Sequence, residues 1–304
     1  MLKNTTMTDT YQPTPEMRRL WAAEKDLLRE LLRVCGEHGL RCWVDGGTLL
    51  GTVRHKGFIP WDDDIDVVMP RADYDRLLDI GATAFQPPFF LQSAYSDRHY
   101  YHGHAQLRNS QMAAIRPSDS YRPFNQGVFI DIFVLDGVPA DKALLKQRLH
   151  DVRRRLRFLK AVDTPIFISG RWGQIFRKLH ARFAVSRKGW QTLYREAEDL
   201  LRATPADESQ QVAELGFSGD DILFDRHIFD DTLWMPFDEM QVPVPVGYDL
   251  LLRTQYGDDY MTPRQAPSYH GDLLIDTERS YKELLPEARR QYRKRQLRKI
   301  FGCK

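Results

Sequence analysis

Residues 61–69 (WDDDIDVVM) constrain the fold more than any other part of this chain. Apolar residues at positions 65, 67 and 69 alternate with Asp64 and Asp66, which predicts a β-strand with one buried face. The same alternation places Asp64 and Asp66 on the opposite face, roughly 7 Å apart at Cα. Two carboxylates held this close on a rigid strand repel each other unless a cation lies between them. The motif therefore predicts a site for Mg²⁺ or Mn²⁺, which prefer oxygen ligands. Asp62 and Asp63 are also compatible with a solvated acidic loop.

A glycine turn precedes the acidic strand. Residues 40–44 predict a short strand, and Gly46 and Gly47 follow it directly before a helix that starts near Thr48. Glycine lets the backbone approach a ligand closely, and the N–H groups at a helix N-terminus bind phosphate. We expect Gly46, Gly47 and Thr48 to contact substrate phosphates, although a plain tight turn would also explain two glycines.

A third carboxylate interrupts a second apolar strand. Residues 128–134 (VFIDIFV) predict a strand that is buried on both faces except at Asp131. Asp131 is either a structural residue satisfied by backbone donors or an arginine, or a third metal ligand from a strand beside the Asp64–Asp66 pair. Three carboxylates can hold two metal ions.

Basic residues between the glycine turn and the acidic strand suit a donor that carries phosphate. Arginine binds phosphate through two hydrogen bonds, so Arg54 is a candidate ligand, and Lys56 is either a second ligand or part of a solvated turn. His102 and His104 lie in a segment predicted as loop, and we interpret them as bystanders.

Charge is segregated along the chain. The formal net charge is +2, but residues 151–190 carry a net +9 and residues 285–304 a net +7, which leaves −14 for the rest. Both basic segments interleave cations with apolar residues, a pattern that suits the surface of an anionic membrane or an anionic glycolipid. We do not expect a nucleic acid as partner. Three cysteines and the lack of an apolar run of about eighteen residues favour a soluble, cytoplasmic protein, with peripheral contact at the inner face of the membrane.

The predicted fold class is α+β, with a nucleotidyltransferase-like core in which helices flank a short mixed β-sheet. The predicted units are an N-terminal helix packed on the core (1–37), the core (38–140), a helical basic elaboration (141–229), a C-terminal part of the catalytic domain (230–280) and a basic amphipathic tail (281–304).

Several runs of residues resemble the LicD–fukutin family. The runs are WVDGGTLLGTVRHKGFIPWDDDIDVVMPRADYDRLL (43–78), LQSAYSD (91–97), HAQLRNS (104–110), GVFIDIFVLDGVP (127–139) and FDEMQVPVPVGYDLLLRTQYGDDYMTP (237–263). This family transfers phosphorylated alcohols from CDP-linked donors to glycans. The resemblance implies Mg²⁺ or Mn²⁺ held by Asp64, Asp66 and Asp131, and a donor pyrophosphate near Gly46, Gly47 and Thr48.

The resemblance also implies further donor contacts. Arg108 matches a basic position of the family pattern, while Glu239 and His270 lie in or beside the C-terminal run and are candidates for contact with the donor's head group. The expected reaction is transfer of phosphocholine from CDP-choline, or of a related phosphorylated alcohol, to a hydroxyl of a cell-surface glycan or a lipid-linked glycan, with release of CMP.

Other functions remain open at this point. A sugar-nucleotide glycosyltransferase also uses an Asp-x-Asp motif, but it leaves Gly46, Gly47 and Asp131 without a role. A non-catalytic scaffold could bind glycan or membrane through the basic helices. A calcium-binding loop of the EF-hand type is excluded, because Val67 occupies the position that requires glycine.

Overall fold

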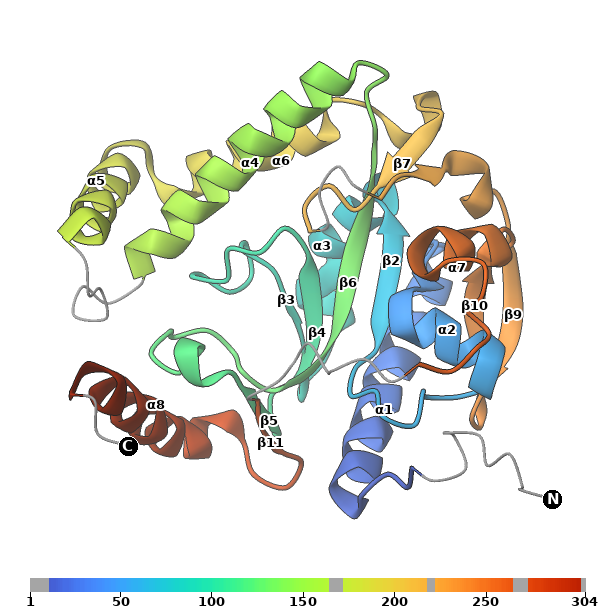
Figure 1. The fold of residues 1–304 in the computed structure, drawn as a ribbon, viewed down its shortest axis with the longest axis horizontal. Coiled ribbons are helices and arrows are strands. Elements are labelled where there is room, and N and C mark those ends of the chain that lie inside the picture. The colour runs from blue at the N-terminus through green and yellow to red at the C-terminus, as the bar shows by residue number, and fades with distance from the viewer. Residues whose placement is uncertain (1–10, 164–171, 218–221, 265–272, 302–304) are drawn as a thin grey trace.

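The computed structural model describes residues 11–163, 172–217, 222–264 and 273–301, and at its centre is a mixed β-sheet (Figure 1). The strand order is β1–β2–β6–β4–β3, and β7 and β8 extend the sheet from one end of β6. Strands β2 and β6 are parallel, whereas the other neighbours are antiparallel. Helices flank this sheet, which confirms the expected α+β class. The strands are β1 (Trp43–Val44), β2 (Asp66–Pro70), β3 (Phe89–Gln92), β4 (Ala105–Asn109), β6 (Val128–Gly137), β7 (Gln211–Ala213) and β8 (Phe224–Asp225).

Helix α1 (Pro15–His38) packs across β6 and β4. The Thr14 hydroxyl accepts a hydrogen bond from the Met17 N–H and begins the helix, and Gly39 ends it in the left-handed conformation with φ of 61°. Leu27, Leu28 and Leu31 share one face and are fully buried in the main core. Each such burial contributes about 1.5–3 kcal/mol, so this face fixes α1 against the sheet.

The C-terminal part of the chain returns to the same core. Strands β9 (Thr232–Phe237) and β10 (Met240–Pro245) form a hairpin, and α7 (Tyr248–Tyr256) follows it. The Trp43 indole N–H donates to Thr232 Oγ1 over 2.9 Å, joining this hairpin to β1. Helices α2 (Gly46–His55) and α3 (Arg71–Ala84) complete the packing around β2.

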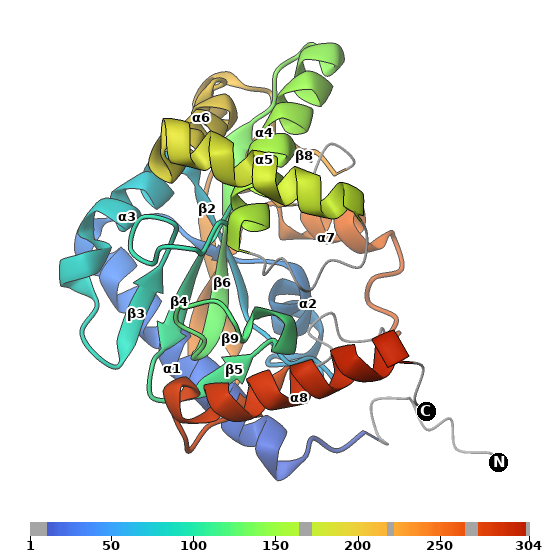
Figure 2. The same cartoon turned by 90° about the vertical axis from the view of Figure 1, so that its left-hand side faces the viewer.

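The described part of the elaboration predicted as helical and basic (141–229) contains three α-helices as well as the strands β7 and β8. The helices are α4 (Lys142–Asp163), α5 (Trp172–Lys188) and α6 (Trp190–Arg202). Helix α8 (Tyr281–Phe301) packs on β5 (Ala113–Ile115), which pairs with β11 (Leu274–Asp276). Figure 2 shows α5 and α8 on the same side of the molecule. Among the described residues, short 3₁₀ helices lie at Pro117–Asp119, Ala206–Glu208 and Arg226–Phe229. None of the helices in the described part of the chain combines the length and apolar content needed to cross a membrane.

Two features of the sheet differ from the sequence-based expectation. Strand β2 begins at Asp66, so Asp64 lies in the segment before the strand rather than within it. That segment is held as a loop because Trp21 donates its indole N–H to the Asp62 carbonyl over 2.9 Å and the Asp62 N–H donates to Ile59. The segment around His102 and His104 was predicted as loop, yet β4 begins directly after His104, and β3 and β5 lie on either side of it in the sequence.

Candidate active site

The parallel pairing of β2 and β6 brings two of the predicted carboxylates together. Asp66 and Asp131 are register partners, and their neighbours Val67 and Ile132 continue the ladder. The Asp131 N–H donates to the Ile65 carbonyl over 3.0 Å, which extends the pairing to the residue before β2. Since residues in register on adjacent strands point to the same face, both carboxylates face the same side of the sheet.

The glycine turn is attached to the start of β2. The Asp45 N–H donates to the Asp66 carbonyl over 3.0 Å, and the Asp66 N–H donates to Thr48 Oγ1 over 2.9 Å. A Cβ on Gly46 would lie 3.0 Å from Asp66 Oδ2, and one on Gly47 only 2.4 Å from Asp62 Oδ2. Gly46 also has a φ of 53°, so glycine is required here both by conformation and by the closeness of the carboxylates.

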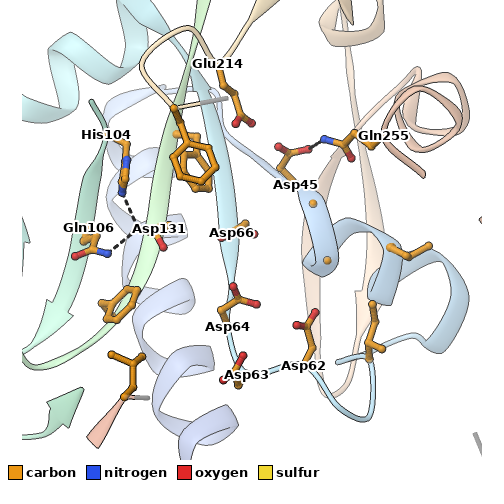
Figure 3. Close-up of a pocket in the computed structure, with 18 of the residues that line it drawn as sticks. Asp45, Asp62, Asp63, Asp64, Asp66, His104, Gln106, Asp131, Glu214 and Gln255 are labelled. Carbon is orange, nitrogen blue, oxygen red and sulfur yellow. Dashed lines mark hydrogen bonds and ion pairs between the residues drawn. The ribbon is translucent and has the colours of Figure 1, made fainter. Parts of the chain in front are cut away.

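Asp62, Asp63 and Asp64 form a compact group of carboxylates. One oxygen of each lies within 4.8 Å of one oxygen of the others, and all three side chains are partly buried. Figure 3 shows them along the segment that leads into β2, below Asp66. Asp62 and Asp63, which the sequence left open as a solvated loop, therefore lie with Asp64 at the site.

These carboxylates line a cavity of about 940 Å³. Figure 3 shows acidic side chains from four different parts of the chain around this space. The acidic residues that line it include Asp45, Asp62, Asp63, Asp64, Asp66, Asp131 and Glu214. The aromatic ones are Trp61, Tyr100, Phe124, Phe129, Phe133, Phe217, Phe224, Tyr256 and Tyr260. The cavity is large enough for a nucleotide-sized ligand, since ligand pockets typically measure about 300–1,000 Å³.

The crowding of carboxylates raises their affinity for protons. The pKa of Asp66 lies well above its usual value because of burial and then the negative charges of Asp64, Asp131, Asp45 and Glu214. Burial, then the negative charge of Asp45 and a hydrogen bond with Asp45, likewise raise the pKa of Glu214 well above its usual value. Carboxylates that hold protons so strongly are equally suited to hold a positive ion.

The donor set fits a hard divalent ion. The carboxylates around Asp66 offer only oxygen atoms, and the oxygens of Asp62, Asp63 and Asp64 are close to the mutual spacing of ligands around one ion. Asp62, Asp63 and Asp64 are the described residues whose oxygens meet this spacing, while Mg²⁺ or Mn²⁺ at Asp64, Asp66 and Asp131 stays a prediction.

Asp131 is fixed by side chains from β4 and the residue before it. The Gln106 amide donates to Asp131 Oδ1 over 2.7 Å, and His104 Nε2 lies 3.1 Å from the same oxygen. All three side chains are buried. His104, which we interpreted as a bystander, is thus a direct partner of Asp131, and that interpretation was wrong. His102 stacks on Tyr100 instead, and burial lowers its pKa.

The predicted phosphate-binding cations are not equally placed. Arg108 is buried in the cavity wall, where it donates to Gln92, Gln106 and the Gly127 carbonyl. Arg54 also lines the cavity and donates to the Tyr260 carbonyl over 2.8 Å. Lys56 is exposed, does not line the cavity and donates to the Val53 carbonyl over 3.2 Å.

Two other predicted contacts, Thr48 and Glu239, do not reach the cavity lining. The Thr48 side chain is buried, and its hydroxyl is used by the Asp66 N–H. Glu239 lies at the surface in ion pairs with Lys25, at 2.7 Å, and with Arg29, so its position gives no contact with a donor in the cavity. His270 lies outside the described residues.

The sequence did not single out Asp45, Glu214 or Phe217. Asp45 Oδ1 accepts a hydrogen bond from the Gln255 amide of α7 over 3.0 Å (Figure 3). Glu214 and Phe217 belong to a turn after β7, in which the Phe217 N–H donates to the Glu214 carbonyl over 2.9 Å. Only the position of Asp45 next to Gly46 was a usable signal, because the other two residues reach the cavity through the tertiary fold.

Comparison with known proteins places the core in one family. Residues 39–162 match the model of the LicD/FKTN/FKRP nucleotidyltransferase domain. The chain is 34% identical over 127 residues to the lipopolysaccharide cholinephosphotransferase LicD of Haemophilus influenzae, an alignment covering 41% of this chain and 46% of that relative. It is also 42% identical over 45 residues to the ribitol 5-phosphate transferase FKRP of Homo sapiens, covering 15% of this chain and 9% of FKRP.

The match covers the part of the chain that builds the carboxylate site. The chain spans about half the length of the LicD relative, and the family model does not extend to residues 237–263, whose resemblance stays a prediction. Within the matched range lie the glycine turn, the acidic segment, β2, β4 and β6. Residues 39–162 of this chain therefore match the LicD/FKTN/FKRP nucleotidyltransferase domain, the family that the sequence resembles.

Proposed function

We propose that this protein is a metal-dependent phosphotransferase. It would transfer a phosphorylated alcohol, phosphocholine in the first place, from a CDP-linked donor to a hydroxyl of a cell-surface glycan or lipid-linked glycan. The observation that carries the proposal is the register of Asp66 and Asp131 on parallel strands, beside Asp64 and against the glycine turn. The similarity to a cholinephosphotransferase and to a ribitol 5-phosphate transferase supports a phosphorylated alcohol as the transferred group.

Each part of the site has a task in this reaction. Mg²⁺ or Mn²⁺ bound at Asp64, Asp66 and Asp131 would neutralise the donor pyrophosphate and the charge that develops on the transferred phosphoryl group. Gly46 and Gly47 leave room for the pyrophosphate at the start of α2. Asp131, which Gln106 and His104 hold in place, would accept the proton of the acceptor hydroxyl.

The phosphorus that the acceptor attacks determines which bond of the donor breaks. The acceptor oxygen forms a bond to the phosphorus that carries the alcohol, and the bond from that phosphorus to the bridging oxygen breaks. The electron pair leaves with that oxygen, so CMP is released and the phosphorylated alcohol stays on the acceptor. Ordinary nucleotidyl transfer differs, because there the phosphorus of the nucleotide is attacked.

The cavity lining supports a cationic head group such as choline. Phe217 packs against Phe133 with ring centroids 4.6 Å apart, and both rings line the cavity that Glu214 also lines. Aromatic faces beside a carboxylate bind quaternary ammonium groups through cation–π and charge interactions. A neutral polyol such as ribitol would use neither the rings nor the carboxylate in this way.

The test is release of CMP from a panel of CDP-linked alcohols. Purified protein with Mg²⁺ is incubated with CDP-choline, CDP-ribitol, CDP-glycerol and, as a comparison, sugar nucleotides. We expect CMP from CDP-choline above the other donors, and its loss with EDTA and recovery with Mn²⁺. Turnover of a sugar nucleotide alone would replace the proposal with a glycosyltransferase, and release of CMP unaffected by EDTA would refute the role of the metal.

A further inference from the structure

Helix α5 presents an apolar stripe to solvent. Phe176, Leu179 and Phe183 are 67%, 49% and 64% exposed. Their spacing of three and four residues places them on one face of the helix. The opposite side of α5 is anchored, since Lys178 and Ala181 are buried and Arg182 donates to the Val162 carbonyl of α4. Two phenylalanines and a leucine on one exposed face need a partner, because such contiguous apolar surface marks interaction sites.

The surroundings of this stripe are basic. Helix α5 contains no acidic residue from Trp172 to Lys188, and Arg187 and Lys188 are exposed at its end. The neighbouring helix α4, which meets α5 through the rings of Phe158 and His180, exposes its own row of cations. That row consists of Lys146, Arg153, Arg154 and Arg157.

A second basic surface lies on the same side of the molecule. Helix α8 buries Leu284 and Ala288 against the core and exposes cations away from it, and Figure 2 shows α8 and α5 facing the viewer together. The exposed cations of α8 include Arg290, Arg293, Lys294 and Arg298. The two basic segments that are separate in the sequence therefore form one face, which we call the α5–α8 face.

We propose that the α5–α8 face docks the protein on an anionic lipid surface, with Phe176, Leu179 and Phe183 inserted between the lipids. Apolar insertion flanked by cations is the arrangement that binds interfacial helices to anionic membranes. A second copy of this chain is a poorer partner, because α5 carries no acidic residue that could pair with the cations of another α5. The inference deepens the proposed function, on which its purpose rests: it would hold the cavity beside an acceptor carried by a lipid.

The experiment measures sedimentation of the full chain with vesicles at physiological salt. Vesicles of phosphatidylcholine alone are compared with vesicles that contain about one third phosphatidylglycerol. We expect binding only to the anionic vesicles. The variant that combines Phe176→Ser and Phe183→Ser should have a partition coefficient lower by at least about tenfold. The variant with Arg290→Gln and Lys294→Gln should lose part of the dependence on anionic lipid.

The matched control is Trp234→Ser. Trp234 is 60% exposed on β9, on the side of the molecule opposite α5 in Figure 1, and its replacement should leave lipid binding unchanged. Failure of the wild type to sediment, or unchanged binding of the Phe176/Phe183 variant, would overturn the proposal. So would a change from dimer to monomer in that variant without loss of lipid binding, since the stripe would then join two copies.

Donor turnover is measured in the same samples without lipid. We expect the Phe176/Phe183 variant to release CMP at the wild-type rate, because α5 lies outside the cavity lining. Loss of lipid binding with normal turnover leaves the proposed function standing. Lipid binding without turnover of any donor leaves the docking face standing and refutes the proposed function.

Discussion

The residue that best characterises the site is Asp66. Its carboxylate faces the charges of Asp64, Asp131, Asp45 and Glu214, which together with burial keep its pKa well above the usual value. Native folds retain such repulsion where it serves binding or catalysis, because the same residues would be more stable as amides. The carboxylates around Asp66 are therefore expected to lower the stability of the folded protein while they serve its activity.

Replacing Asp66 or Asp64 with asparagine should separate these two effects. We expect donor turnover to fall about a hundredfold or more, since charge stabilisation dominates phosphoryl transfer. The melting temperature measured in EDTA should rise for Asp66→Asn, because a buried repulsion is removed. Asp26→Asn, in an exposed ion pair with Arg29 on α1, is the control that should change neither quantity appreciably. Near-wild-type turnover in both site variants would eliminate the mechanism.

Glu24 of α1 is a second acidic residue in an unfavourable environment for a carboxylate charge. It is only 2% exposed, and its Oε2 has no hydrogen-bond partner among the described residues. Burial and then the charges of Asp64, Asp63, Asp62 and Asp131 raise its pKa well above the usual value. The folded protein therefore holds this proton to higher pH than the unfolded chain does, and stability falls as pH rises above the unfolded pKa of about 4.5.

Glu24→Gln should therefore raise the melting temperature at neutral pH. Glutamine has no charged form, so the variant avoids the free energy that the wild type needs to keep Glu24 protonated, and each kcal/mol corresponds to about 2–4 °C in a protein of this size. The difference from wild type should shrink as the pH is lowered towards 4.5, because both forms are then neutral. Thermal melts across this pH range test it, and a difference that stays constant with pH would show that Glu24 does not titrate as described.

At the scale of elements, the attachment of the glycine turn to β2 sets the geometry of the site. The turn meets the strand through two backbone hydrogen-bond donors, Asp45 N–H and Asp66 N–H, and through the absence of side chains at Gly46 and Gly47. A methyl group at either glycine would push against a carboxylate that the site needs. The glycine turn thus joins α2 to the start of β2, in addition to its proposed role in binding phosphate.

Gly46→Ala should lower both stability and activity. Alanine at a φ of 53° costs about 1–2 kcal/mol, and its Cβ would lie 3.0 Å from Asp66 Oδ2. We expect a lower free energy of unfolding in urea together with a large loss of donor turnover. Gly36→Ala is the control, since a Cβ there meets nothing within 4 Å and alanine favours helix α1 by up to about 1 kcal/mol. Equal behaviour of the two variants would contradict the required role of Gly46.

The elements show what local sequence could and could not predict. The strand that begins at Val128 was predicted from its run of apolar residues, because it is buried on both faces along most of its length. Strand β4 was missed although Ala105, Leu107 and Asn109 alternate with Gln106 and Arg108. All five residues are buried, and the polar pair faces the site. Buried polar residues look like loop residues until their partners in the fold are known.

At the scale of the whole molecule, the site is assembled from distant segments. The core contributes the aspartates of the site, α7 contributes Gln255, and the turn after β7 contributes Glu214 and Phe217. The elaboration at 141–229 therefore also leads the chain back into the cavity. Neither Glu214 nor Phe217 has a local pattern that marks it, so their place in the site follows only from the arrangement of the whole chain.

Phe217→Ala should distinguish cationic from neutral head groups. Loss of a cation–π contact corresponds to about tenfold in kcat/KM, so turnover of CDP-choline should fall by this factor while that of CDP-ribitol changes little. Steady-state rates of CMP release with both donors measure this ratio. Phe176→Ala, on a residue of similar exposure outside the cavity lining, serves as the control. Equal losses with both donors would indicate that Phe217 only shapes the cavity.

The pairing of β2 with β6 makes catalysis sensitive to the hydrophobic interior. Ile130 and Ile132 flank Asp131 and are completely buried, so they point away from the site into the apolar layer under the sheet. Sliding β6 by one residue would turn Asp131 into that layer and expose an isoleucine in its place. Ile130 and Ile132 lie on the face away from the cavity, and their burial thereby fixes the register of Asp131 with Asp66. Smaller apolar side chains at these positions would loosen the register of β2 and β6. Such core variants could abolish the proposed activity while the secondary structure persists.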